Sequence, residues 1–375
     1  MFPNFLTIRN TFSRHLPAIA IALLLSLVVG CGSSGSISSV PPPTAPSGAA
    51  KPILVGLVTQ GPSETETPPA NNFEELYAHP GVYSAAVIQL YWSQLEPSEG
   101  VFDDSSLTSA LAKLAAYNAQ YPATPVVGKL RIFMGLGTPA WVATATGPVT
   151  LTDSSGKSAT IGEFWTAAYA SLWQALQQHL ASEYDSNPMI GEVAITSCSS
   201  LTGEPFILPH SQAEIAVLHQ AGYTDAEGMA CLTNAPADFA AWKNTPLDYT
   251  FNSFTETDSG VGVSNTSFPL QEMAIFRAAL GTRGVVANHG LQPTLTPDAV
   301  PIYAEFQTLY TQAVSAGTSS PLEFQTYGPT VDWPSTITFA LTYHPTEIEI
   351  WDTVAAGGLA PLTQSQLAQW AAMLQ

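Results

Sequence analysis

Short apolar segments of the β type alternate with segments rich in Ala, Leu and Gln over residues 51–375. Most of the apolar segments lack in/out alternation, which favours strands buried on both faces in a parallel sheet covered by helices. The strand candidates are residues 53–59, 86–91, 130–135, 191–196, 249–254, 284–288, 322–326 and 347–351. The helix candidates are residues 107–117, 164–184, 212–220, 235–245, 270–280, 299–316 and 364–374. Eight such strands at this length predict a single-domain α/β fold, the (β/α)8 TIM barrel. An open doubly wound sheet is the alternative, but no nucleotide-binding fingerprint supports it.

The start of the chain has the pattern of a secretory signal. Arg9 and Arg14 precede an apolar run over residues 18–29, and Cys31 follows a glycine directly. A basic start, a short apolar run and a small residue before the break are typical of a signal peptide, and the run is short for a membrane span. The cysteine in this place resembles the lipobox of bacterial lipoproteins, which implies removal of residues 1–30 and lipidation of Cys31. An uncleaved apolar anchor with an incidental cysteine is the alternative.

Residues 31–50 are rich in Ser, Pro and Gly and contain too little apolar material to offset the entropy of ordering them. We therefore expect a flexible tether, with a folded domain over residues 51–375. Gly32 rather than Asp follows the cysteine, which by the same resemblance implies delivery to the outer membrane or cell surface. The predicted location is a bacterial membrane, outside the cytoplasm.

The charge balance excludes one class of partner. The chain has 29 acidic and 10 basic residues, a formal net charge of −19, so nucleic acid is not an expected partner. Charged and aromatic residues each make up 10% of the chain, a profile typical of an extracellular protein that faces carbohydrate. No Cys/His set has zinc-ligand spacing and no Gly-rich phosphate loop follows a strand, so neither a metal nor a cofactor is predicted.

Beyond Cys31 the chain has two further cysteines, Cys198 and Cys231. An even pair in an oxidising compartment predicts a disulfide between them. Two buried free thiols are the alternative.

Two segments carry a family resemblance. The stretch from Trp92 to Asp103 reads W-S-Q-L-E-P-S-E-G-V-F-D, and residues 135–142 read G-L-G-T-P-A-W-V. Both resemble retaining glycosidase barrels, notably the family 42 β-galactosidases and related, family 5-like members of glycoside hydrolase clan A. In such families the glutamate at the position of Glu96 is structural. Trp141 is either a sugar platform or part of the packed rim.

By the same resemblance, the acid/base glutamate follows the fourth strand, usually as Asn-Glu-Pro. Glu204 precedes a proline there, but Gly203 stands where the asparagine normally binds the sugar 2-hydroxyl. The resemblance implies that Glu204 is the general acid/base, a role that needs a raised pKa and a place near the glycosidic oxygen. A loop carboxylate that caps a turn is the alternative.

By the same resemblance, the nucleophile lies on the seventh strand. A retaining mechanism needs it to be a carboxylate about 5 Å from the acid/base carboxyl group. Glu323 is the acidic residue of that strand, although it comes two or three positions before the end. Glu349 on the eighth strand is the second candidate for the nucleophile. Arg131 lies in an apolar strand and needs a carboxylate partner inside the barrel, so pairing with Glu323 or Glu349 is the structural alternative for each.

Other polar and aromatic side chains near predicted strand ends complete the candidate site. Trp351 resembles the tryptophan on the last strand that forms the floor of the sugar site in these enzymes. The candidate substrate-binding residues are Trp92, Arg131, Trp141, Asn252, Asn288, His289, Gln325 and Trp351.

Together the lipobox-like start and the resemblance to clan A imply a surface-anchored retaining glycoside hydrolase that acts on a polysaccharide or oligosaccharide. A barrel that has lost its nucleophile and binds glycans is the first alternative, suggested by Gly203 and Gln325 at catalytic positions. An extracytoplasmic scaffold is the second.

Overall fold

The structure, a computed structural model, describes residues 50–60, 68–152, 158–207, 211–260, 263–327, 332–351 and 362–374. The chain divides into two units, Met1–Pro46 and Ser47–Gln375, and all described residues belong to the second unit. The expected signal peptide, the lipidated Cys31 and nearly all of the tether therefore lie outside the described residues.

Eight parallel strands close into a barrel, so the predicted (β/α)8 fold is confirmed. Neighbouring strands follow the order β1, β2, β3, β6, β7, β10, β11, β12, and β12 pairs with β1. The barrel strands are β1 (Gly56–Gln60), β2 (Tyr83–Tyr91), β3 (Val127–Phe133), β6 (Ile190–Ala194), β7 (Leu247–Thr250), β10 (Gly284–Leu291), β11 (Leu322–Thr326) and β12 (Glu347–Trp351). Each coincides with or overlaps one of the predicted strands.

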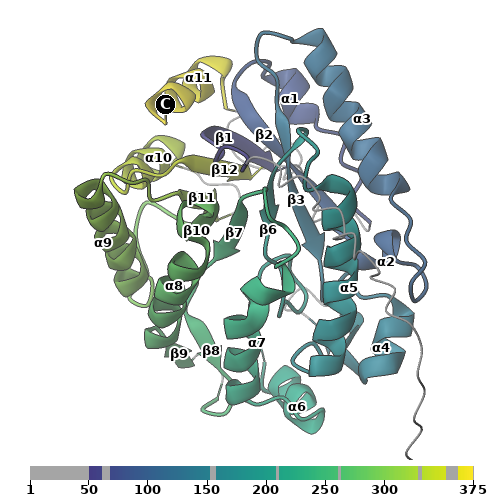
Figure 1. The fold of residues 1–375 in the computed structure, drawn as a ribbon. Coiled ribbons are helices and arrows are strands. Elements are labelled where there is room, and N and C mark those ends of the chain that lie inside the picture. The colour runs from purple at the N-terminus through teal and green to yellow at the C-terminus, as the bar shows by residue number, and fades with distance from the viewer. Residues whose placement is uncertain are drawn as a thin grey trace, which may run out of the picture. The chain divides into compact units, whose positions relative to one another are not determined.

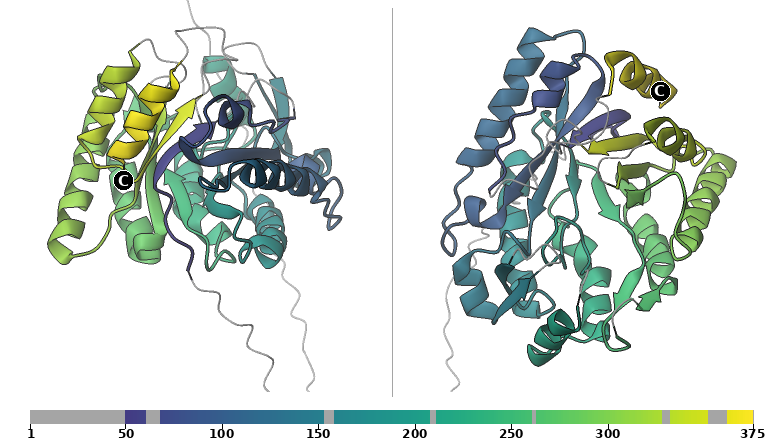
Figure 2. Two further views of the ribbon diagram at one scale, coloured as in Figure 1. Left: turned by 90° about the horizontal axis from the view of Figure 1, so that it is seen from above. Right: turned by 180° about the vertical axis from the view of Figure 1, so that it is seen from behind.

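The helices lie outside the strands, as Figures 1 and 2 show. They are α1 (Glu74–Ala78), α2 (Trp92–Leu95), α3 (Ser105–Gln120), α4 (Ala140–Thr146), α5 (Ala167–Tyr184), α6 (Gln212–Gln220), α7 (Asp225–Asp238), α8 (Ser267–Leu280), the 3-10 turn η2 (Gly281–Arg283), α9 (Val300–Ala316), α10 (Trp333–Leu341) and α11 (Gln364–Met373). Two hairpins, β4 (Pro148–Thr152) with β5 (Ser158–Gly162) and β8 (Phe254–Glu256) with β9 (Val263–Asn265), extend the connections and were not predicted.

The predicted helix over residues 235–245 is wrong. The helix in this region is α7, which begins after Thr224, whose side chain accepts a hydrogen bond from the Glu227 amide. Beyond its end, the backbone N–H groups of residues 243–245 donate to the Asp185 carboxylate. These amides are satisfied without a helix, so the chain turns directly into β7.

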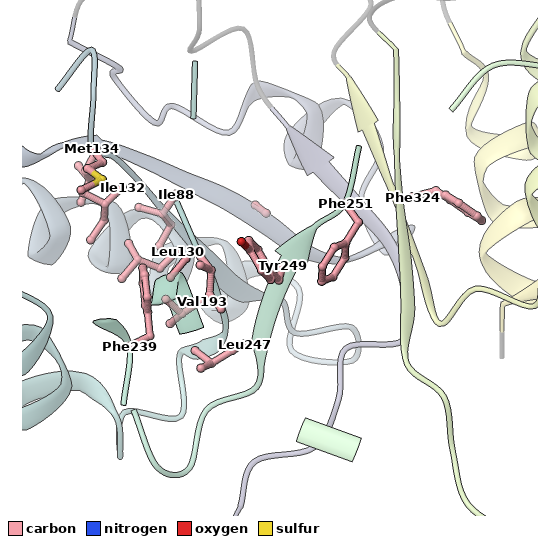
Figure 3. Packing of buried hydrophobic residues seen from close by; sticks show 14 of the residues in the cluster. Ile88, Leu130, Ile132, Met134, Val193, Phe239, Leu247, Tyr249, Phe251 and Phe324 are labelled. Atoms are coloured by element: carbon pink, nitrogen blue, oxygen red, sulfur yellow. The ribbon is translucent and has the colours of Figure 1, made fainter. Parts of the chain in front are cut away.

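The hydrophobic core lies between the strands and the helices. Figure 3 shows Leu130, Val193, Leu247 and Phe239, all members of this core, gathered beside the strands. On β3 the alternate residues, Lys129 and Arg131, therefore point into the barrel. No described helix is long and apolar enough to cross a membrane.

Candidate functional site

A cavity of about 440 Å³ opens at the carboxyl ends of β7, β10 and β11. The end of a TIM barrel at which the strands finish is where functional residues collect, because the loops there come from every strand. Four predicted site residues line this cavity: Glu204, Asn252, Asn288 and His289. Glu204 follows β6, Asn252 follows β7, and Asn288 and His289 lie in β10, so the structure brings together residues that are far apart in the sequence.

The Glu204 carboxylate meets His289 at the floor of the cavity. His289 Nδ1 lies 2.8 Å from Glu204 Oε1, and its Nε2 lies 3.2 Å from Glu323 Oε2 and 3.0 Å from the Thr250 hydroxyl. Burial alone would lower the pKa of His289, but Glu323 and Glu204 raise that pKa to about 10. The imidazole is therefore an imidazolium that donates one N–H to each glutamate.

Asn288 and Asn252 are held in place by hydrogen bonds of their own. The Asn288 amide donates to the Phe251 carbonyl at 2.8 Å and to Asn252 Oδ1 at 2.7 Å, and its oxygen accepts from Tyr303 at 3.0 Å. These bonds fix both side chains beside the cavity before any ligand arrives. Such preorganised polar groups orient a ligand at small entropic cost.

Below the cavity, the barrel interior holds a cluster of buried charges around Lys129. TIM-barrel interiors are usually filled by layers of Val, Ile and Leu, so this interior is exceptional for its fold. Lys129 Nζ lies 3.0 Å from Glu192, 3.0 Å from Asp248, 3.4 Å from Glu323, 3.6 Å from Glu347 and 3.6 Å from Glu349. Burial opposes the charge on Lys129, but these carboxylates raise its pKa well above the usual value. An ammonium thus serves as the central cation of the barrel.

Arg131 pairs with Glu349 inside the barrel. Its two terminal nitrogens each lie 2.8 Å from a Glu349 oxygen, and Nη1 also donates to Gln325 Oε1 at 3.1 Å. The pairing with Glu349 confirms the structural alternative for both residues, and the direct pairing of Arg131 with Glu323 is not found. Arg131 and Gln325, which were expected to bind substrate, are buried inside the barrel and do not line the cavity.

Both candidates for the nucleophile are buried with their charges already paired. Glu323 and Glu349 have 0% exposed surface and contact Lys129, and neither lines the cavity. The imidazole of His289 stands between Glu323 and Glu204. A retaining pair needs a sugar carbon, rather than a protein ring, between its two carboxylates. In this arrangement Glu323 and Glu349 are buried counter-ions of Lys129, Arg131 and His289.

The aromatic residues of the family-like segments pack on the rim. Trp92 is fully buried; its indole N–H donates to Glu96 Oε2 at 2.8 Å, and Glu96 Oε1 accepts from the Gly100 amide at 2.9 Å. The structural role of Glu96 is therefore confirmed, whereas Trp92 cannot contact a substrate. Trp141 donates to the Glu96 carbonyl and packs edge-on against Trp92, which corresponds to the packing alternative. Trp351, at the end of β12, is half-buried and does not line the cavity.

The loop that carries Glu204 is fastened to the helical shell. Cys198 and Cys231 form the predicted disulfide, which joins the start of this loop to α7. Gly203 lies against the barrel mouth: a Cβ there would come within 3.0 Å of the Phe133 ring and 3.2 Å of Arg131 Cδ. The asparagine that the clan A pattern places here would not fit without movement of these side chains.

Asp248, His289 and Glu323 form a group of possible metal ligands, with ligand atoms within 4.8 Å of one another. The Lys129 ammonium already lies 3.0 Å from Asp248 and 3.4 Å from Glu323. His289 offers no lone pair while both its nitrogens are protonated. The positive charge that a metal would supply is thus present already, so we assign no metal to this group.

Burial raises the pKa of two carboxyl groups of the cluster, that of Glu192 to about 7 and that of Glu347 well above its usual value. The folded state therefore binds protons that the unfolded chain has released, as it does at His289.

This linkage predicts that stability falls as pH rises. The contribution of His289 is fully present below about pH 6.5, the ordinary histidine pKa, and is lost as pH rises through about 10. We expect the difference in unfolding free energy between the wild type and a His289→Gln variant to shrink by several kcal/mol between pH 6.5 and pH 10. Urea unfolding of both proteins across this range measures the difference. A constant difference would show that His289 carries no extra proton in the folded state.

The residues that surround the predicted ones were not predicted from the sequence. Asp298 and Tyr327 line the cavity, and Lys129, Glu192 and Asp248 build the cluster beneath it. A charged residue within an apolar strand indicates a buried ion pair. Lys129, Glu192 and Asp248 have this pattern as clearly as Arg131 and the glutamates of the last two strands, for which pairing was predicted.

Solved structures share this fold, although no protein-family model and no curated protein matches the sequence. The catalytic domain of β-amylase from Paenibacillus polymyxa has a TM-score of 0.54 at 10% identity, over 86% of this chain and 100% of that one. Endo-glycoceramidase II from Rhodococcus sp. has a TM-score of 0.51 at 11% identity, over 86% of this chain and 81% of that one. The β-galactosidase from Rahnella sp. R3 has a TM-score of 0.50 at 12% identity, over 87% of this chain and 57% of that one.

All three are TIM-barrel glycoside hydrolases. The chain thus shares the closed barrel of these enzymes, with a polar cavity at the carboxyl ends of β7, β10 and β11. At this level of identity the likeness shows the fold alone.

Proposed function

We propose that this protein binds carbohydrate in the cavity around Glu204. The observation that carries the proposal is that Glu204, Asn252, Asn288 and His289 meet in one cavity at the end of the barrel where ligands bind. Glu204 is the one predicted catalytic carboxylate that reaches this cavity, with 16% of its side chain exposed.

The lining of the cavity suits a sugar. Hydroxyl groups need donors and acceptors fixed in direction, and the Asn252 amide and the Glu204 carboxylate supply them, whereas Asn288 spends its hydrogen bonds inside the protein and holds Asn252 in place. Phe206 and the exposed Tyr327 add aromatic surface against which the C–H face of a pyranose ring packs. The glycoside hydrolases of like fold make a glycan the first class of ligand to test.

We further propose that the protein is exported and held on a bacterial membrane by lipid on Cys31, with the tether between lipid and barrel. The basis is the lipobox-like sequence before Cys31, which lies outside the described residues. A flexible tether lets the cavity reach polymeric material near the cell. Metabolic labelling with a tagged fatty acid tests this, and a Cys31→Ser variant that still incorporates the label would contradict it.

Hydrolysis is the second candidate function, favoured by the place of Glu204-Pro205 after the fourth barrel strand and by the fold. Glu204 would be the acid/base and Glu323 the nucleophile. For that mechanism His289 must leave its place between the two glutamates, and Glu323 must separate from Lys129. Breaking such buried pairs costs several kcal/mol, so binding without turnover fits the geometry better.

The test is a panel of plant and microbial oligosaccharides, measured for binding by calorimetry and for cleavage by release of reducing ends. We expect binding to at least one glycan, weakened about 10- to 100-fold in Glu204→Gln, because a charge-assisted hydrogen bond is lost. Glu227→Gln is the matched control, since Glu227 is an exposed glutamate of α7 that does not line the cavity.

The two candidate functions give different results in this assay. Binding without new reducing ends selects the glycan-binding protein. Cleavage that drops by a factor of about 100 or more in Glu204→Gln selects the hydrolase with Glu204 as acid/base. Binding that is unchanged in Glu204→Gln would remove Glu204 from the site.

A further inference from the structure

The charged groups of the cavity that are exposed to solvent are all negative. Glu204 and Asp298 contribute carboxylates, and none of the residues that line the cavity in the described part of the chain is a lysine or an arginine. The pKa of Asp298 is lowered, mainly by a hydrogen bond from the Thr296 side chain, so Asp298 is ionised at neutral pH. Any ligand in this cavity therefore meets negative charge.

The one cationic group of the lining is already used. His289 donates one N–H to Glu204 and the other to the fully buried Glu323. The next cations, Lys129 and Arg131, are buried in the barrel against their own carboxylates. An acidic ligand would thus find no free positive partner in the cavity.

Glu204 has one oxygen available for a ligand. Its Oε1 accepts from His289, whereas Oε2 makes no hydrogen bond with any residue that the structure describes. An ionised carboxylate is an acceptor only, so the group that satisfies Oε2 must be a donor. A hydroxyl supplies one donor, and an ammonium supplies three together with the opposite charge.

We propose that the ligand of this cavity is a glycan that carries protonated amino groups, that is, an amino sugar without its acetyl group. This inference rests on the proposed function and names the class of sugar. An ammonium beside Glu204 and Asp298 neutralises the surplus charge of the cavity, whereas a uronate would add to it. The overall charge of −19 acts in the same direction, because it concentrates cations near the protein and repels acidic polymers.

The expected preference is large enough to measure. A charge-assisted hydrogen bond is about twice as strong as a neutral one, so at low salt the amino sugar binds at least about tenfold more tightly than its neutral analogue. Because both carboxylates are partly exposed, salt screens this preference, and most of it is lost at 1 M NaCl.

The experiment uses matched oligosaccharides that differ in one substituent. Within each of several linkage series, the sugar carries a hydroxyl, an N-acetyl group or a free amine at C2, or a carboxylate at C6, and binding is measured by calorimetry at two salt concentrations. The proteins are the wild type, Glu204→Gln, Asp298→Asn and the control Glu227→Gln. We expect the free amine to bind most tightly in at least one series, and both cavity variants to reduce its advantage over the hydroxyl form.

Each other outcome is decisive. Neutral sugars that bind as well as the amines, or uronates that bind at all, would overturn the inference and leave the proposed function standing. An amine preference that Glu227→Gln reduces as much as Glu204→Gln would show general attraction to an acidic protein and also overturn it. No binding in any series, together with no binding in the wider panel, would overturn the proposed function itself.

Discussion

Replacement of Lys129 by Met should lower the free energy of unfolding by about 3–5 kcal/mol, the usual cost of removing one partner from a buried ion pair. The Nζ atom contacts the carboxyl groups of Glu192, Asp248 and Glu323, among others, and all of them are buried. Met has a similar length and no charge, so the barrel would retain its shape and lose its central cation. Urea unfolding at pH 7.5 measures the effect.

The pH dependence distinguishes a charge effect from a packing effect. In Lys129→Met the carboxylates that lose their ammonium partner can be neutralised by protons. The loss in unfolding free energy relative to the wild type should therefore shrink as pH falls toward 5. Adding Glu323→Gln, which removes a buried carboxylate 3.4 Å from the lost ammonium, should restore part of the stability at pH 7.5. Lys243→Met, at an exposed lysine, is the control and should change little. Wild-type stability of Lys129→Met at pH 7.5 would refute the idea that this ammonium holds the cluster together.

Loss of the disulfide is the second large effect. Cys198 and Cys231 are separated by 33 positions, and a cross-link over a loop of this length contributes about 4 kcal/mol in the chain-entropy description. We expect Cys198→Ala/Cys231→Ala to lose about this amount. The double variant should also bind glycans more weakly, because the disulfide fastens the loop that carries Glu204.

Reduction supplies the control for this prediction. The oxidised wild type should expose no alkylatable thiol from this pair, and a reductant should destabilise it to the level of the double variant. The same reductant should leave the double variant unchanged. If the variant unfolds at the urea concentration of the oxidised wild type, the cross-link contributes nothing to stability.

The barrel could be predicted from the sequence because its signal is local. Each strand is a short apolar run between helical segments, and the run over residues 322–326 appears in the structure with the same bounds. The predicted helix over residues 235–245 was wrong for a non-local reason. The backbone N–H groups of residues 243–245 donate to the carboxylate of Asp185, which is far away in the sequence. A window of sequence does not contain that contact.

The site could be predicted only in part. Glu204, Asn252 and His289, which were expected near strand ends, line one cavity. The depth of a side chain along its strand was harder to predict. Each residue along a strand advances by about 3.3 Å, and successive side chains point to opposite faces. Glu323 comes second in β11 and points at Lys129 below the cavity. Whether a tryptophan faces a cavity or a neighbouring ring depends on packing that the sequence does not show, as Trp141 illustrates.

The most direct test of carbohydrate binding by this cavity is a crystal structure of the protein with the tightest-binding oligosaccharide of the panel. We predict a sugar ring in the cavity, with a donor of the sugar at hydrogen-bonding distance from Glu204 and another contact to Asn252. A sugar bound only elsewhere on the barrel, with Glu204 and His289 untouched, would contradict the account.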